Sequence, residues 1–157
     1  HQLYPYILRR GFVPALQSMG DQIESVISIE MDLDQELVRK ERADRSLIPE
    51  QAKLAAYRIA EEALTNVVKH ANASKVSVRL ETPFGGWFRL TVQDDGQGFA
   101  VEESLEGMGI VGMRDYAEAI GGECVILGAP GKGTQVTATL PLVILEKEFP
   151  ETALLSE

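Results

Sequence analysis

Residues 58–72 read RIAEEALTNVVKHAN, a largely apolar segment that is interrupted by regularly spaced polar residues. On a helix, polar side chains recur every four residues along one side: Arg58, Glu62, Asn66 and His70, with Lys69 one step aside. The rest of the helix surface is apolar, which predicts that it faces the core. The residues expected in the core are Ala55, Ile59, Ala63, Leu64, Val67 and Val68.

The polar side of this helix has the chemistry of a site for a metal-bound polyphosphate. A carboxylate can orient or deprotonate a water, and an amide oxygen is a ligand that Mg²⁺ accepts. Lysine and histidine can contact phosphate oxygens. An exposed helix face would show the same residues, so this stretch alone leaves both interpretations open.

Three glycine-containing motifs follow in the C-terminal half of the chain. They are DDGQG at 94–98, GMGIVGMR at 107–114 and GKGT at 131–134. The second motif includes G-x-G-x-x-G, which is also the dinucleotide-binding fingerprint. That fingerprint needs a preceding buried strand and an acidic residue about 20 positions later. Residues 99–106 do not read as such a strand, and 128–131 are GAPG, so the dinucleotide interpretation is rejected.

In this order and spacing, the helix and the three motifs resemble the N, G1, G2 and G3 boxes of the GHKL ATP-binding fold. Histidine kinases, gyrase B, Hsp90 and MutL share that fold. The sequences YRIAEEALTNVVKHA and GMRDYAEAIGGE are most similar to those of sensor histidine kinases of the class paired with helix-turn-helix (NarL-type) response regulators. The resemblance covers roughly residues 20–143. It implies an α+β fold, a two-layer sandwich whose mixed sheet is covered on one face by helices (Bergerat/GHKL fold).

The resemblance also implies which residues form the site and which cofactors they bind, namely ATP and Mg²⁺. Asp94 would read the adenine amino group, and Asn66 would be the Mg²⁺ ligand. Glu62 joins Asn66 as a catalytic residue, either activating a water or orienting the water shell of the metal. The segment from about Phe99 to Gly109 would be a mobile lid. The implied ATP-binding residues are Asn66, Lys69, His70, Asp94, Gly96, Gly98, Gly107, Gly109, Ile110, Gly112, Met113, Gly133 and Thr134.

Hydrophobic periodicity predicts the elements of the fold. Helices are expected at 49–71 and 113–120, a broken helix at 1–20 and loops at 34–47 and 95–108. Strands are expected at 27–33, 76–80, 88–92, 123–128 and 134–140. The predicted domain organisation has three parts: 1–20 as the end of a dimerisation region, 21–145 as the ATP-binding domain, and 146–157 as an acidic tail.

Composition narrows the function further. The net charge is −9, which argues against broad nucleic-acid binding, and the single cysteine excludes an internal disulfide. The sequence shows neither a membrane-spanning run nor a signal peptide. These features and the resemblance imply a cytoplasmic domain, although its parent protein can still be membrane-anchored.

The expected function is the ATP-binding catalytic domain of a two-component sensor histidine kinase. It would transfer the γ-phosphoryl group of ATP to a histidine on a dimerisation domain that this chain lacks. The expected partners are that dimerisation domain and, through the full-length kinase, a response regulator; the parent would be a homodimer and this fragment a monomer. The alternative is a nucleotide-gated interaction module that transfers no phosphate.

Overall fold

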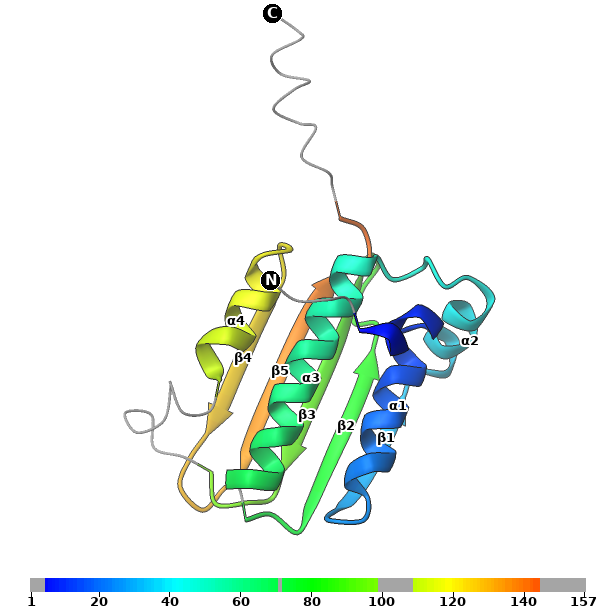
Figure 1. Cartoon of the computed structure of the whole chain (residues 1–157). Coiled ribbons are helices and arrows are strands. Elements are labelled where there is room, and N and C mark those ends of the chain that lie inside the picture. Colours follow the sequence, from blue (N-terminus) through cyan, green and yellow to red (C-terminus); the bar gives the residue numbers. More distant parts are fainter. Residues whose placement is uncertain (1–4, 71, 99–108, 145–157) are drawn as a thin grey trace, which may run out of the picture.

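The computed structural model describes residues 5–70, 72–98 and 109–144. Five strands form one sheet in the order β1-β2-β3-β5-β4, in which β1 and β2 are parallel and the other neighbours are antiparallel (Figure 1). The strands are β1 (Ser28–Leu33), β2 (Lys75–Glu81), β3 (Trp87–Asp94), β4 (Glu123–Gly128) and β5 (Thr134–Pro141). The helices are the 3-10 turn η1 (Tyr6–Arg10), α1 (Phe12–Ile23), α2 (Gln35–Ala43), α3 (Glu50–His70) and α4 (Ile110–Glu118).

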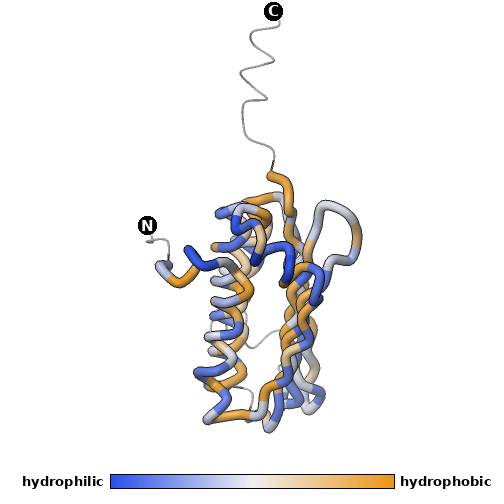
Figure 2. Tube along the Cα trace, turned by 90° about the vertical axis from the view of Figure 1, so that its right-hand side faces the viewer, coloured by the Kyte–Doolittle hydropathy of each residue, from blue (hydrophilic) through white to orange (hydrophobic). Residues whose placement is uncertain are grey.

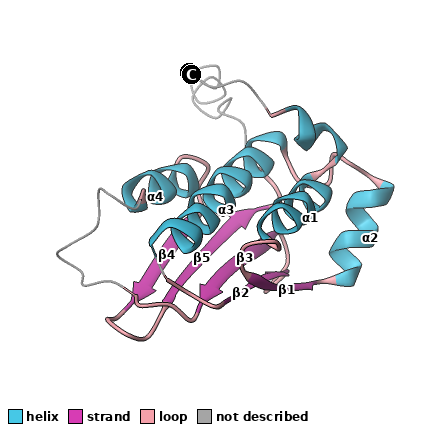
Figure 3. Cartoon of the chain, turned by 60° about the horizontal axis from the view of Figure 1, so that its bottom comes forward, coloured by secondary structure: helices cyan, strands magenta, loops and turns pink. Residues whose placement is uncertain are grey.

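The helices α1, α3 and α4 lie side by side on one face of the sheet, and Figure 2 shows the two layers edge-on (Figures 2 and 3). Alternate residues of the central strands point into the core between the sheet and the helices. Examples are Val76 and Val78 of β2 and Phe88 and Leu90 of β3. The ring of Phe88 packs 6.1 Å from the ring of Phe12 in α1, centroid to centroid. The predicted two-layer α+β sandwich with one covered face is therefore confirmed.

Most of the predicted elements are also confirmed, including the long helix and all five strands. One residue of α3 is placed differently from the prediction. Val68 was expected in the core, but 43% of its side chain is exposed. It lies with Met19, Ile23 and Leu64 along a groove between α1 and α3.

The prediction of a loop at 34–47 is wrong, because residues Gln35–Ala43 form α2. Asp34 caps this helix: its Oδ1 accepts hydrogen bonds from the N–H groups of Glu36 at 2.9 Å and Leu37 at 3.3 Å. The segment is highly charged, so its helical period is hard to see. Only Leu37 and Glu41, one turn apart, are buried.

The N-terminal segment is more closely integrated than its prolines and glycines suggest. Pro14 lies in the first turn of α1, where a proline is tolerated. Leu8, Phe12 and Leu16 are completely buried in the same core as the sheet. The predicted boundary at residue 20 therefore falls inside α1. The assignment of 1–20 to a dimerisation region stays a prediction, and the predicted tail 146–157 lies outside the described residues.

Candidate functional site

The predicted site residues gather where the C-terminal half of α3 overlies the ends of β3 and β5. Asp94 is the last residue of β3 and is only 7% exposed, on the side of the sheet that faces the helices. Its Oδ1 accepts a hydrogen bond of 2.8 Å from the N–H of Gly96. Burial raises the pKa of the Asp94 carboxyl, although the N–H groups of Gly96 and Thr134 act in the opposite direction. A buried carboxylate can accept a hydrogen bond from an exocyclic amine.

Two glycines allow the loops around Asp94 to approach each other backbone to backbone. Gly133 has a φ of +79°, and a Cβ there would clash with the carbonyl oxygen of Asp94. Gly98 has a φ of +67°, and a Cβ there would clash with the carbonyl oxygen of Ala129. The predicted G1 and G3 motifs are therefore in direct contact, and their glycines are required by this contact.

The start of α4 meets Glu62 of α3. Gly109 caps α4 in the left-handed conformation, with a φ of +67°. A Cβ on Gly109 would lie 2.6 Å from Oε1 of Glu62, so the carboxylate sits against the N-terminus of α4. Ile110 and Met113, both predicted to bind ATP, are 1% exposed and hold α4 against the core. Gly112 is half-buried, and a Cβ added to it would meet no atom within 4 Å outside its own helix backbone and its chain neighbours.

The end of α3 brings some of the predicted residues together and leaves others on the surface. Asn66 is half-buried and follows Glu62 by one helical turn. The side-chain amide of Gln97 donates a hydrogen bond of 2.7 Å to the carbonyl oxygen of His70, which ties α3 to the loop after Asp94. The side chain of His70 is exposed, and Lys69 is an exposed residue that lines the groove between α1 and α3.

Asp95 has a structural role that the sequence did not reveal. Its carboxylate accepts hydrogen bonds from the N–H groups of Ser74 at 2.9 Å and Lys75 at 3.0 Å, and from the Ser74 hydroxyl at 2.6 Å. Hydrogen bonds from Ser74 and Lys75 lower the pKa of this exposed carboxyl. Its partners are 20 or 21 positions away, so no local signal could have identified them.

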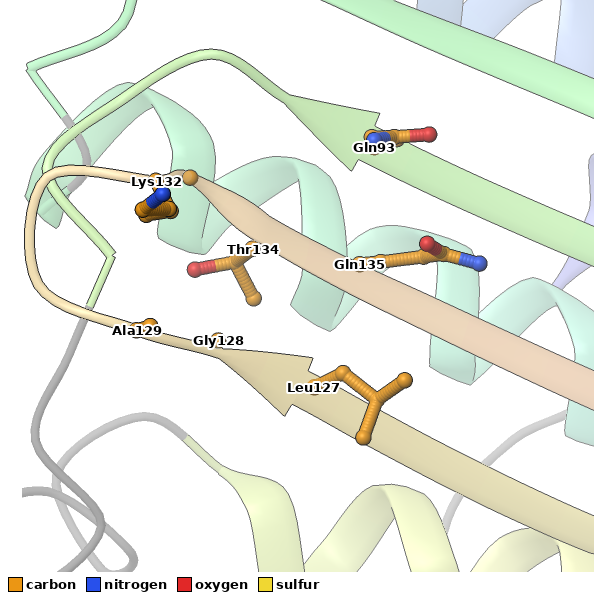
Figure 4. A pocket seen from close by; sticks show the side chains of 8 residues that line it. Gln93, Leu127, Gly128, Ala129, Lys132, Thr134 and Gln135 are labelled. Carbon is orange, nitrogen blue, oxygen red and sulfur yellow. The ribbon is translucent and has the colours of Figure 1, made fainter.

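A small hollow of about 160 Å³ lies behind the β4–β5 turn, on the sheet face without helices (Figure 4). Gln93 of β3 points toward it, whereas its neighbour Asp94 points to the helix side, since adjacent strand residues face opposite ways. This hollow therefore opens on the face opposite to Asp94, although two of the predicted ATP-binding residues, Gly133 and Thr134, also line it. It is lined by Gln93, Leu127, Gly128, Ala129, Lys132, Gly133, Thr134 and Gln135.

The site offers few metal ligands of its own. The described residues contain no group of three or more His, Cys, Asp or Glu side chains that could hold a metal. The amide of Asn66 and the carboxylate of Glu62 are hard oxygen donors one helical turn apart. Mg²⁺ commonly takes one or two protein oxygens and completes its shell with waters and phosphate oxygens, so the donor set fits it. Gly107 and the rest of the predicted lid, 99–108, lie outside the described residues.

Comparison with known proteins agrees with this arrangement. Signal transduction histidine-protein kinase/phosphatase DegS of Brevibacillus brevis is 32% identical over 148 residues, which cover 90% of this chain and 36% of that protein. Sensor histidine kinase LiaS of Bacillus subtilis is 34% identical over 141 residues, with 88% and 36% covered. The chain thus spans about a third of the length of these two relatives. It has no described helix long and apolar enough to cross a membrane.

Solved structures show the same fold. The blue-light activated histidine kinase EL346 of Erythrobacter litoralis superimposes with a TM-score of 0.62 at 24% identity, covering 81% of this chain and 40% of that one. The catalytic domain of histidine kinase ThkA superimposes with a TM-score of 0.59 at 13% identity, covering 87% and 92%. The sequence profile of one family matches residues 51–144, from the start of α3 to the end of the described chain. The chain therefore belongs to the family of histidine kinase-, DNA gyrase B- and HSP90-like ATPases.

Proposed function

We propose that this chain is the ATP-binding catalytic domain of a two-component sensor histidine kinase. In this role it presents the γ-phosphoryl group of ATP to a histidine on a dimerisation domain outside the chain. The observation that carries the proposal is the buried Asp94, fixed by Gly96 and by the backbone of Gly133 at the end of α3. The similarity to DegS and LiaS, whose names describe histidine kinases, supports the kinase over other members of the family.

In this proposal the protein's contribution is positioning and charge neutralisation, as in other phosphoryl transfers. Asp94 accepts a hydrogen bond from the adenine amino group. Asn66 would hold Mg²⁺, which supplies positive charge beside the phosphates when bound. Glu62, placed between Asn66 and the start of α4, would orient the water shell of the metal or accept a proton.

A pair of adjacent carboxylates gives a controlled test of adenine recognition. Asp94→Ala should weaken ATP binding by about 10–150-fold, because a hydrogen bond to a charged group contributes roughly 1.5–3 kcal/mol. Asp95→Ala is the matched control, because Asp95 bonds Ser74 and Lys75 instead of facing the helices. Calorimetric titration with ATP and GTP measures both variants. Equal binding of ATP and GTP by the unmutated chain would contradict the assignment of Asp94.

Phosphotransfer itself needs a separate test, because ATPases and kinases of this family share one nucleotide site. The chain is mixed with a dimerisation segment from its own gene and Mg-ATP, and acid-labile phosphohistidine is measured. Label on that segment supports the kinase and a response regulator as its downstream partner. ATP binding without any transfer would favour the alternative, a nucleotide-gated interaction module.

A further inference from the structure

Glu41 of α2 is a buried carboxylate that the nucleotide site does not use. It is 2% exposed, and both of its oxygens bind the start of another helix. Oε2 accepts a hydrogen bond of 2.6 Å from the N–H of Phe12, and Oε1 accepts one of 2.9 Å from the N–H of Val13. We call this contact the Glu41 cap.

The Glu41 cap replaces a local cap that α1 lacks. The first N–H groups of a helix have no partner within the helix, and a short polar side chain at the preceding residue usually binds one of them. That preceding residue is Gly11, which has no side chain. Glu41 supplies the acceptors from 29 and 28 positions further along the chain, and its negative charge suits the positive end of the helix dipole.

Gly11 provides the room for this contact. Its φ is +117°, a conformation that residues with a side chain rarely adopt. A Cβ on Gly11 would lie 2.9 Å from Oε1 and 3.2 Å from Oε2 of Glu41. Gly11 and Glu41 therefore form one unit, in which the glycine turns the chain from η1 into α1 and the carboxylate holds that turn.

The docking of α2 depends on very few side chains. Among the residues of α2, only Leu37 and Glu41 are buried, and Val38 packs against the core while partly buried. The hydrogen bonds of Glu41 are the side-chain hydrogen bonds that join α2 to the N-terminal end of α1 among the described residues. Release of α2 would remove the cap, and loss of the cap would remove a main anchor of α2.

We propose that the Glu41 cap is a coupling element that fixes the direction in which the chain enters the domain through η1. When the cap is formed, the bend at Gly11 is fixed, and η1 and α1 form one rigid unit with the sheet. With the cap open, the entry segment loosens while the nucleotide site at the far end of α3 stays intact. Two relatives are about three times as long as this chain, so in a protein of that length any part that lies before η1 would take its orientation from this point.

Amide hydrogen exchange on the whole chain tests the cap directly. Glu41→Gln keeps the shape but replaces one acceptor oxygen with an amide donor. We expect the Phe12 and Val13 amides to exchange about 10–100-fold faster, which is the effect of losing one charged hydrogen bond. Glu36→Gln is the matched control on the same helix, since Glu36 is exposed and pairs only with Arg39 at 3.6 Å among the described ion pairs. Gly11→Ala should give the same local acceleration with Glu41 unchanged.

A second measurement addresses the entry direction. Tyr6 is 80% exposed in η1, so a nitroxide on Tyr6→Cys, in a Cys124→Ala background, reports the motion of the entry segment. The electron paramagnetic resonance spectrum of the label should sharpen when the Glu41→Gln substitution is introduced. The ATP affinity of the same variant should change less than twofold. An unchanged spectrum, or faster exchange spread evenly over all amides, would overturn the proposal. If the unmutated chain did not bind ATP, that result would count against the proposed function but would not affect this inference.

Discussion

Gly131 and Gly133 form a matched pair that isolates the close backbone approach to Asp94 in the candidate nucleotide site. Both lie in the β4–β5 turn with nearly the same backbone angle, φ +77° and +79°. A Cβ on Gly131 would meet nothing within 4 Å, whereas a Cβ on Gly133 would fall closer than 3.0 Å to the carbonyl oxygen of Asp94. Alanine at each position therefore carries the same backbone cost, but only Gly133→Ala adds a clash.

The expected magnitudes follow from these two contributions. A left-handed residue with a Cβ costs about 1–2 kcal/mol, and the reduced freedom of the unfolded chain returns about 0.4–1 kcal/mol. Gly131→Ala should therefore lower the free energy of unfolding by about 1 kcal/mol. Gly133→Ala should cost a further 1–3 kcal/mol or so, the usual cost of overpacking against groups that cannot move aside.

Urea denaturation measures the two variants side by side. With an m-value of about 2 kcal/mol/M, the midpoint of Gly133→Ala should fall roughly 0.5–1.5 M below that of Gly131→Ala. The clash also displaces Asp94, so ATP affinity should drop in Gly133→Ala and stay near the original value in Gly131→Ala. Equal midpoints and equal affinities would refute the reasoning, because they would mean that the approach of Gly133 to Asp94 has no energetic consequence.

Two further predictions concern the chemistry of the site. Because burial raises the pKa of Asp94, the amine of adenine should lower it again by favouring the ionised form. Binding should then release a proton in acidic buffer, and ATP affinity should rise with pH through the range in which the Asp94 carboxyl ionises and level off above it. Calorimetry in two buffers of different ionisation enthalpy checks this, and identical heats would speak against it. Asn66→Ala should reduce the effect of Mg²⁺ on ATP affinity more than the affinity measured without metal. Titrations with and without Mg²⁺ compare the two, and an unchanged metal dependence would contradict the assignment of Asn66 as the Mg²⁺ ligand.

The sequence predicted well those features that repeat over short distances. The alternation along β2 and β3 and the four-residue repeat along α3 are local patterns, and burial in the structure follows them closely. The glycines at which the G1 and G3 motifs approach each other, Gly98 and Gly133, lie in motifs that the sequence already shows, but their role in ATP binding stays a prediction. Asp94 stood out as a carboxylate at the end of a strand just before glycines.

Features that depend on distant partners were beyond the sequence. Glu41 and Asp95 look like ordinary surface carboxylates, and only the fold brings them to backbone N–H groups 20 to 29 positions away. The loop predicted at 34–47 failed for a related reason. The charged segment that forms α2 has only two buried residues, so its helical period is nearly invisible against its charge.

The order of the strands has a consequence for how the protein is made. β5 is the last strand in sequence, yet it lies inside the sheet, between β3 and β4. While the chain emerges from the ribosome, β4 has no strand to pair with and the outer edge of β3 stays open. The carbonyl of Asp94 also lacks the turn at Gly133 that packs against it. A nascent chain therefore completes the candidate nucleotide site only after residues 133–141 have been synthesised, so a ligand bound there would stabilise finished molecules but could not assist the early steps of their folding.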